Sequence, residues 1–508
     1  MEILQSLAAG FAVILTPANL YYCFIGSLVG TLVGVLPGIG PLAALSLLLP
    51  FTFNLPPVAS LVMLSAIFYG AMYGGSTTSI LVNMPGEAAS VVTCLDGHEM
   101  AKQGRAGAAL GMAALASFVA GTLGTVALTV FSPVLVVLAL RFGPPEYFAV
   151  MVLGFVMTLF MVGGSALKAM VMLALGVFLS TVGMDVVTGV ERFAFGSVNL
   201  SGGFDLVAVV MGLFGVSEIL LNIEESAAGE IVSRKIRGLL PTLRDWRDSW
   251  AAILRGSALG FGLGVLPGGG PVTASFLSYA LERRVSRHPE RFGHGAIEGV
   301  AGPEAANNAA VAGAMIPLLS LGLPSNAVTA LLLGALIIHG VQPGPMLMAQ
   351  RPDIFWGVIA SLYVGNVMLL VLNLPLVGLW VQLLRVPYRI LFPIILLLTV
   401  IGTYSINHNI FDVWVMIGFG LAGYVLRKLD YELAPLVLAL VLGPLLEQAL
   451  RQSLIMSSGS PAIFVTRPIT GALILLAAVL VILLVVGRRR NHREAGLLAG
   501  PQPREGSS

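Results

Sequence analysis

The sequence predicts an all-α polytopic membrane protein, built from two inverted-topology repeats with broken or re-entrant helices and followed by one C-terminal helix. Three observations predict this fold class: an apolar composition, a series of long apolar segments, and an internal repeat. Hydrophobic residues make up 57% of the 508 residues and charged residues 10%, whereas soluble domains contain about 45–50% and about 25%. Lipid is therefore the main solvent expected for this chain.

Long apolar segments recur along the whole chain. About 18 apolar residues suffice to cross the hydrocarbon core of a bilayer as a helix. The segments do not alternate polar and apolar residues, as the strands of a membrane barrel do, so we expect helices. They lie at 107–140, 147–163, 168–184, 204–222, 353–384, 390–405, 411–426, 432–449 and 468–487.

An internal repeat relates residues 26–41 to residues 256–271. Ten of the sixteen positions are identical at a constant offset of 230. In both copies glycines recur every fourth residue, a spacing that lets two helices approach closely, so we expect the glycines before the breaks to serve helix packing. Secondary transporters often build their binding site between two such repeats.

Basic residues set the predicted orientation, because short loops rich in Lys and Arg stay in the cytoplasm. The central linker carries six basic residues between 234 and 255, and four arginines lie between 488 and 493. With both regions inside, equivalent loops of the two repeats face opposite sides, which predicts inversion. The predicted units are a first repeat (1–228), a cytoplasmic linker (229–255), a second repeat (256–450), an external loop with a final transmembrane helix (451–487) and a cytoplasmic tail (488–508).

Proline and glycine interrupt the helices at matching places. Irregular backbone at membrane depth is tolerated only where it is buried in protein or lines a wet cavity, so these breaks point to a site, although simple kinks remain the alternative. At a broken helix, free N–H groups suit a carboxylate. The residues expected to contribute at the breaks are Gly38, Gly40, Asn83, Pro85, Gly86, Gly268, Gly270, Pro324, Ser325 and Asn326.

Two polar clusters, 74–79 and 304–309, lie at the same offset of 230. Hydroxyl and amide oxygens can bind Na⁺ or a carboxylate, whereas the alternative is bonding back to their own helix. The candidate binding residues in these clusters are Ser76, Thr77, Thr78, Glu304, Asn307 and Asn308. Of these, Ser76, Thr77, Asn307 and Asn308 are the candidates for binding Na⁺. Glu87 and Glu304 are candidates for coupling a proton or cation, whereas Asp96 to Arg105 and 282–294 are expected to leave the membrane on the cytoplasmic side.

No enzyme motif competes with this interpretation. The sequence has no His-Glu-x-x-His and no phosphate-binding loop followed by lysine. The two cysteines, Cys23 and Cys94, lie in apolar stretches without metal-ligand spacing and are expected to pack. No cofactor and no nucleic-acid partner is expected. A membrane-embedded enzyme stays as an alternative from another class.

Several short motifs of the sequence resemble those of the large membrane subunit of the tripartite tricarboxylate transporter family. They are Gly-Val-Leu-Pro-Gly-Ile-Gly-Pro (34–41), Tyr-Gly-Gly-Ser-Thr-Thr-Ser-Ile-Leu (73–81), Pro-Gly-Glu-Ala-Ala-Ser-Val-Val-Thr (85–93), Leu-Asp-Gly-His-Glu-Met-Ala (95–101), Pro-Glu-Ala-Ala-Asn-Asn-Ala-Ala (303–310) and Leu-Leu-Leu-Gly-Ala-Leu-Ile-Ile-His-Gly (331–340). Ser325 departs from the family pattern, in which a glycine is expected after the proline.

This resemblance implies an uptake system of the bacterial inner membrane that is driven by an ion gradient, Na⁺ or H⁺. Its partners would be a small four-helix membrane subunit and a periplasmic solute-binding protein that delivers a di- or tricarboxylate. A stand-alone carboxylate symporter of similar inverted design is the nearer alternative.

Overall fold

The computed structural model describes residues 2–36, 40–161, 165–185, 187–224, 238–384 and 388–498. Within these ranges the chain is almost entirely helical, and its strands are a two-residue antiparallel pair, β1 (Gly183–Met184) and β2 (Glu191–Arg192). Nine helices of the described part are long and apolar enough to cross a membrane. The predicted all-α polytopic fold is confirmed.

The N-terminal part, before the central linker, alternates long helices with short ones. Its helices are α1 (Glu2–Ile14), α2 (Pro17–Val35), α3 (Gly40–Thr52), α4 (Pro57–Val82), η1 (Ala88–Ser90), α5 (Val91–Thr93), η2 (Cys94–His98), α6 (Glu99–Lys102), α7 (Ala106–Ala139), α8 (Pro144–Met161), α9 (Ala166–Ser180), α10 (Val198–Ser201), α11 (Leu206–Val210), η3 (Met211–Val216) and α12 (Ser217–Glu224). Of these, η1 is a 3₁₀ turn, and η2 and η3 are π-helical turns.

The C-terminal part follows the same plan. Its helices are α13 (Leu243–Val265), α14 (Pro271–Val285), η4 (Pro289–Arg291), α15 (Glu298–Leu321), α16 (Ala327–Ile338), α17 (Leu347–Gln350), α18 (Pro352–Asn373), α19 (Val377–Leu383), α20 (Tyr388–Asn407), α21 (Ile410–Lys428), α22 (Ala434–Met456), α23 (Ile463–Thr466) and α24 (Pro468–Leu498). Helix α13 begins inside the segment predicted as a linker.

The proline-glycine stretches interrupt helices, as predicted. Helix α2 ends at Val35 and α3 begins at Gly40, and α13 ends at Val265 and α14 begins at Pro271. Gly38 lies outside the described residues. The apolar run 353–384, expected as one segment, is divided between α18 and α19, and the expected loop 282–294 is helical up to Val285.

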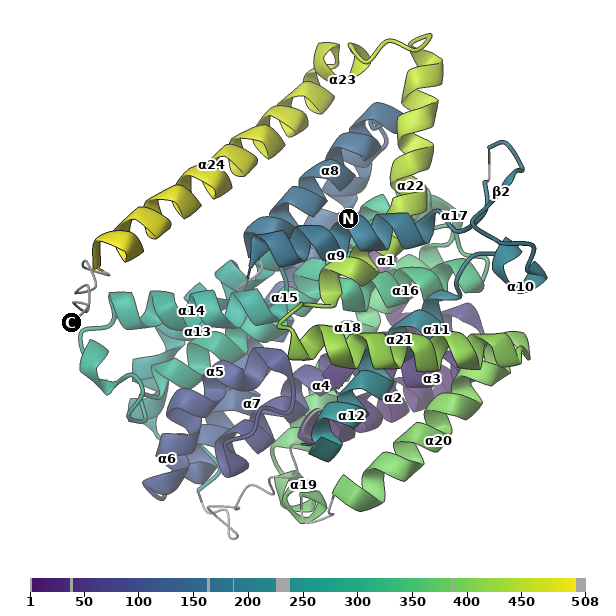
Figure 1. Ribbon diagram of the computed structural model, residues 1–508. Helices are drawn as coiled ribbons and strands as arrows, with labels where there is room; N and C mark the ends of the chain where they lie inside the picture. Colours follow the sequence, from purple (N-terminus) through teal and green to yellow (C-terminus); the bar gives the residue numbers. More distant parts are fainter. Residues whose placement is uncertain are drawn as a thin grey trace, which may run out of the picture.

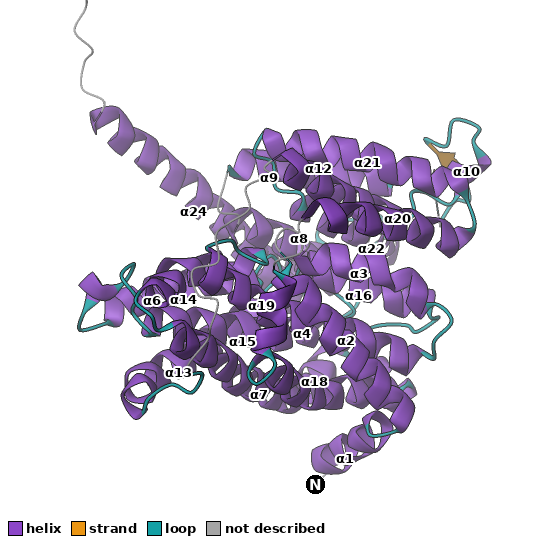
Figure 2. Ribbon diagram, turned by 90° about the horizontal axis from the view of Figure 1, so that it is seen from below, coloured by secondary structure: helices purple, strands orange, loops and turns teal. Residues whose placement is uncertain are grey.

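The helices form two groups, each drawn from both parts of the chain. Seen from below, one group contains α1, α2, α4, α7, α13, α15 and α18, and the other contains α9, α12, α20, α21 and α22 (Figure 2). In the first group α2 packs along α4 and α13 along α15, while α7 packs on α15 and α18 on α4. The N- and C-terminal parts are thus interleaved, because each contributes a helix that packs on the other's buried polar helix.

Glycine ladders produce the closest helix contacts. A Cβ atom built at Gly30 would lie 2.5 Å from the carbonyl oxygen of Ile67, and one at Gly260 would lie 2.1 Å from that of Ala306. No side chain fits at such distances, so glycine is required where α2 crosses α4 and where α13 crosses α15. The packing role expected for the ladders is confirmed at Gly260 and its neighbours in register.

Helix α24 leaves the body of the molecule at an angle and packs on α8 and α23 (Figure 1). At its start, the Glu146 carboxylate of α8 accepts hydrogen bonds from Arg467 Nε at 2.6 Å and Thr470 Oγ1 at 2.8 Å. The side chain of Glu146 is 2% exposed and that of Arg467 is 38% exposed. A partly buried ion pair therefore ties the last helix to α8.

Candidate functional site

The two predicted polar clusters lie on helices α4 and α15, which are buried over nearly their whole length. Because both helices are surrounded by protein, their polar side chains cannot reach lipid or bulk water. The cluster residues, all at most 3% exposed, are Ser76, Thr77 and Thr78 of α4 and Glu304, Asn307 and Asn308 of α15. Such groups need partners within the protein.

Glu304 of α15 receives hydrogen bonds from two hydroxyl groups of the N-terminal part. Thr93 Oγ1 donates to Glu304 Oε1 at 2.5 Å, and Ser117 Oγ of α7 lies 3.4 Å from Glu304 Oε2. Asn308 Nδ2 donates to Ser117 Oγ at 2.7 Å and to the backbone carbonyl of Glu304 at 3.1 Å. One carboxyl group therefore joins α5, α7 and α15.

Asn307 carries the contact to a second buried carboxyl group. Its Nδ2 lies 3.4 Å from Glu87 Oε1, and the backbone N–H of Ala89 donates to Glu87 Oε2 at 2.6 Å. Glu87 lies against Gly75 of α4, where a Cβ atom would come within 2.8 Å of its Cγ. We call the resulting set the polar core: Ser76, Glu87, Thr93, Ser117, Glu304, Asn307 and Asn308.

The polar core holds two carboxyl groups and only neutral partners. Within the described residues neither Glu87 nor Glu304 forms an ion pair. Among the described residues, the buried amide oxygens Asn307 Oδ1 and Asn308 Oδ1 have no hydrogen-bond partner, and the Ser76 side chain interacts with the Glu304 carboxyl group. Unpartnered oxygens beside uncompensated carboxyl groups offer ligands to a hard cation or a proton. No group of three His, Cys, Asp or Glu side chains suited to a metal occurs in the described part.

The two breaks of the C-terminal part, at 267–271 and 322–326, meet at another place. The backbone N–H of Gly268 donates to the carbonyl oxygen of Ser325 at 2.7 Å, and Gly270 lies 3.8 Å from the Asn326 side chain, measured from a Cβ built on the glycine. Thr158 of α8 covers this tip, so closely that a Cβ at Gly268 would lie 2.5 Å from its backbone. Because Gly268 has φ +78°, glycine is required here for both space and conformation.

The helix starts after the second breaks are capped by their own side chains. Glu87 accepts the N–H of Ala89 at the start of η1, and Asn326 accepts the N–H of Thr329 at 3.0 Å at the start of α16. Both are reciprocal capping arrangements. At these two helix starts, the N–H groups of Ala89 and Thr329 are therefore bonded to protein side chains in this conformation.

The remaining predicted residues serve the backbone. Thr78 Oγ1 donates across to the carbonyl oxygen of Val35 at 2.8 Å, and Asn83 ends α4 in a left-handed conformation with φ 58°. Gly86 packs against the carbonyl oxygen of Gly34, and Gly40 opens α3 with φ +64°. Pro85 is exposed and Pro324 is buried.

Several groups of the site escaped sequence analysis. Ser117 lies in the 34-residue apolar helix α7, where nothing in the sequence separates it from other small hydroxyl residues. Thr93 and Thr158 likewise occupy apolar surroundings. Asp96, expected at the cytoplasmic end of a helix, is fully buried in protein, and donors of the C-terminal part surround its carboxylate, which the sequence did not indicate.

Broken helices, a buried two-carboxyl polar core and the nine candidate spans of the described residues define a polytopic α-helical membrane protein. Comparison with known proteins identifies the family. The chain belongs to the tripartite tricarboxylate transporter TctA family, whose model matches residues 20–438.

Two relatives from Agrobacterium vitis are similar to the chain. The first, described as an uncharacterized 52.8 kDa protein in the TAR-I ttuC' 3' region, is 50% identical over 474 residues, which are 93% of this chain and 94% of the relative. The second, described as an uncharacterized protein in the TAR-II ttuC' 3' region, is 56% identical over 212 residues, which are 42% of this chain and 88% of the relative. No solved structure matches the chain.

Proposed function

We propose that the protein is the large membrane subunit of a secondary active uptake system for a small di- or tricarboxylate in the bacterial inner membrane. The solute would arrive on a periplasmic binding protein, a small four-helix membrane subunit would complete the complex, and the C-terminus would lie in the cytoplasm. Family membership supports the transport of tricarboxylates. The observation that carries the ion coupling is the polar core.

The polar core supports coupling because it places two buried carboxyl groups together, with no basic partner among the described residues. An isolated carboxylate is costly in such surroundings, so Glu87 and Glu304 favour binding a proton or Na⁺. Asn307 Oδ1 and Asn308 Oδ1, which have no hydrogen-bond partner among the described residues, can act as ligands, and Ser76 Oγ lies at the same carboxyl group. In this proposal the bound cation offsets the negative charge that a carboxylate solute brings between the two groups of helices, and the inverted repeats then expose the site alternately to each side.

Reconstitution tests the proposal. Purified protein in liposomes, with the small subunit present and the solute-loaded binding protein enclosed or added outside, should accumulate a radiolabelled carboxylate when an inward Na⁺ or H⁺ gradient is imposed. Uptake that ignores both gradients would contradict the proposal. Equal uptake of free solute without the binding protein would favour the stand-alone symporter.

The asparagine pair provides a variant test. Replacing Asn307 and Asn308 with Ala removes the amide contacts to Glu87 and Ser117. We expect uptake to be abolished while the amount of protein in the membrane is unchanged, as measured by transport and by immunoblot of the same vesicles. Transport at the wild-type rate would place the site elsewhere.

A further inference from the structure

A second polar joint between the N- and C-terminal parts is built around one carboxylate, Asp96 in the π-helical turn η2. Its Oδ1 accepts the backbone N–H groups of Gly293, Gly295 and Ala296 at 2.9, 2.8 and 2.8 Å, and its Oδ2 accepts the Tyr279 hydroxyl at 2.9 Å. The side chain is 0% exposed. Four donors from the C-terminal part therefore converge on one residue of the N-terminal part.

The loop that supplies these donors is shaped for the carboxylate. Gly293 and Gly295 have φ values of +85° and +96°, which glycine adopts without strain. Such turns point successive N–H groups into one concavity, an arrangement that binds anions. At the rim, Gln103 Nε2 of the N-terminal part donates to the His294 carbonyl oxygen at 2.8 Å, so the loop is held from two sides.

Close packing seals the seam between η2 and the first turn of α15. A Cβ atom at Gly299 would lie 2.2 Å from Asp96 Oδ2, and one at Gly97 would lie 2.8 Å from Ile80 Cγ1 and 3.6 Å from Val300 Cγ2. A larger residue at Gly299 would therefore collide with Asp96, whereas Gly97 is in ordinary van der Waals contact with Val300 of α15. We call this contact the η2–α15 seam.

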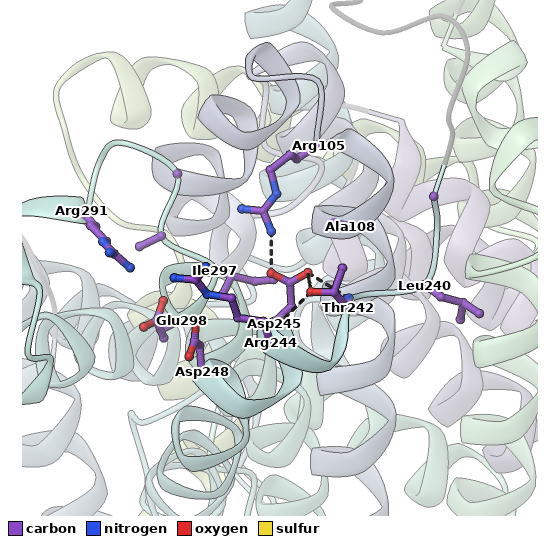
Figure 3. A pocket seen from close by; sticks show the side chains of 13 residues that line it. Arg105, Ala108, Leu240, Thr242, Arg244, Asp245, Asp248, Arg291, Ile297 and Glu298 are labelled. Atoms are coloured by element: carbon purple, nitrogen blue, oxygen red, sulfur yellow. Dashed lines mark hydrogen bonds and ion pairs between the residues drawn. The ribbon is translucent and has the colours of Figure 1, made fainter.

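A cavity of about 420 Å³ lies against the other side of the same loop (Figure 3). Arg105 reaches from the top of the view to Asp245, with which it forms an ion pair, and Arg291 lies at the left of the view. The full lining is Arg105, Ala108, Gly238, Leu240, Thr242, Arg244, Asp245, Asp248, Arg291, Gly295, Ala296, Ile297 and Glu298.

The seam lies between this cavity and the polar core on both segments of the chain that form it. On α15 the cavity wall ends at Glu298, the seam follows at Gly299, and Glu304 of the polar core comes six residues after Glu298, about 9 Å along the helix axis. On the other segment, residues 93–105, Thr93 belongs to the polar core, Asp96 to the seam and Arg105 to the cavity. The same order holds on both sides of the contact.

We propose that the η2–α15 seam is the gate between the polar core and this cavity, and that Asp96 is the latch that keeps it closed. The inference rests on the proposed transport function: the cavity is then the exit vestibule, on the side that the positive-inside rule predicts to be cytoplasmic from the neighbouring arginines. Opening requires the loop 293–296 to leave Asp96, so the seam must separate once in every transport cycle.

Cross-linking the rim tests this gate. In full-length protein with Cys23 and Cys94 replaced by Ala, Gln103→Cys and His294→Cys place one thiol on each side of the seam, both at exposed positions. Joining them with a short, reducible thiol cross-linker should lower carboxylate uptake in liposomes at least about 10-fold, and reduction should restore it. Glu99→Cys with Lys102→Cys, a pair on one side of the seam, is the matched control. Uptake that is unchanged after cross-linking would overturn the gate.

Hydrogen exchange tests the latch without any solute. Asp96→Asn keeps the size of the side chain but replaces a charged acceptor, and charged acceptors make the stronger hydrogen bonds. The amides of Gly293, Gly295 and Ala296 should exchange at least about 10-fold faster than in wild type or in the control Glu99→Gln. Equal exchange would overturn the latch. If the double-cysteine variant does not transport before cross-linking although wild type does, the hydrogen-exchange result alone tests the role of Asp96 as the latch. If wild type does not transport either, the proposed transport function is wrong.

Discussion

Replacing Glu304 with Gln separates the structural role of this carboxyl group from its proposed role in ion coupling. Gln keeps one carbonyl oxygen for Thr93 or Ser117, and the other hydroxyl can rotate to accept from the new NH₂ group. We therefore expect the free energy of unfolding to change by only about 1 kcal/mol. The loss of the negative charge is expected to affect transport instead, because it removes a ligand for the coupled cation.

The expected effect on transport follows from the same contacts. Hydrogen bonds and ligand contacts to a charged group contribute about 1.5–3 kcal/mol, which corresponds to roughly a 10- to 150-fold loss. Initial uptake should fall by that factor in Glu304→Gln liposomes, while thermal stability in detergent stays near wild type. Glu432→Gln, at an exposed position, is the control. Wild-type uptake by Glu304→Gln would refute the coupling role of this residue.

Two further substitutions test the packing and the attachment of the last helix. Gly260→Val should lower the stability by about 1–3 kcal/mol or more, because a Cβ there would lie 2.1 Å from a carbonyl oxygen of α15. Gly262→Val, where a Cβ would have nothing within 4 Å, is the control and should melt at the wild-type temperature. Equal melting temperatures for the two variants would contradict the ladder contact. Arg467→Gln should cost about 1 kcal/mol after allowing for the half-exposed guanidinium, and it should speed hydrogen exchange in the first turn of α24; unchanged exchange would show that Glu146 does not hold this helix.

The breaks and the ladders could be predicted from the sequence because their causes are local. Pro271 begins a helix, Gly268 adopts a left-handed conformation, and glycines four residues apart fall on one helix face. Each of these properties belongs to the residue itself and its near neighbours. The sequence therefore located the interruptions and the close helix contacts correctly.

The partners of the polar groups could not be predicted, because they come from remote segments. Thr93 meets Glu304 across 211 residues, and Asp96 meets Ala296 across 200. Sequence reasoning placed Asp96 outside the membrane because an unpaired charge is costly in lipid. It did not predict the four donors that surround this buried carboxylate, because they come from residues about 180 to 200 positions further along the chain. Inversion of the two repeats stays a prediction.

Ion movement coupled to the solute is the most direct test of the account. Liposomes with an internal pH indicator or Na⁺ indicator should report an inward ion flux that begins when carboxylate is added, with no imposed gradient, and Glu304→Gln should reduce it together with uptake. The account predicts that the flux of one of these two ions accompanies the solute. Carboxylate entry without movement of either ion would contradict it.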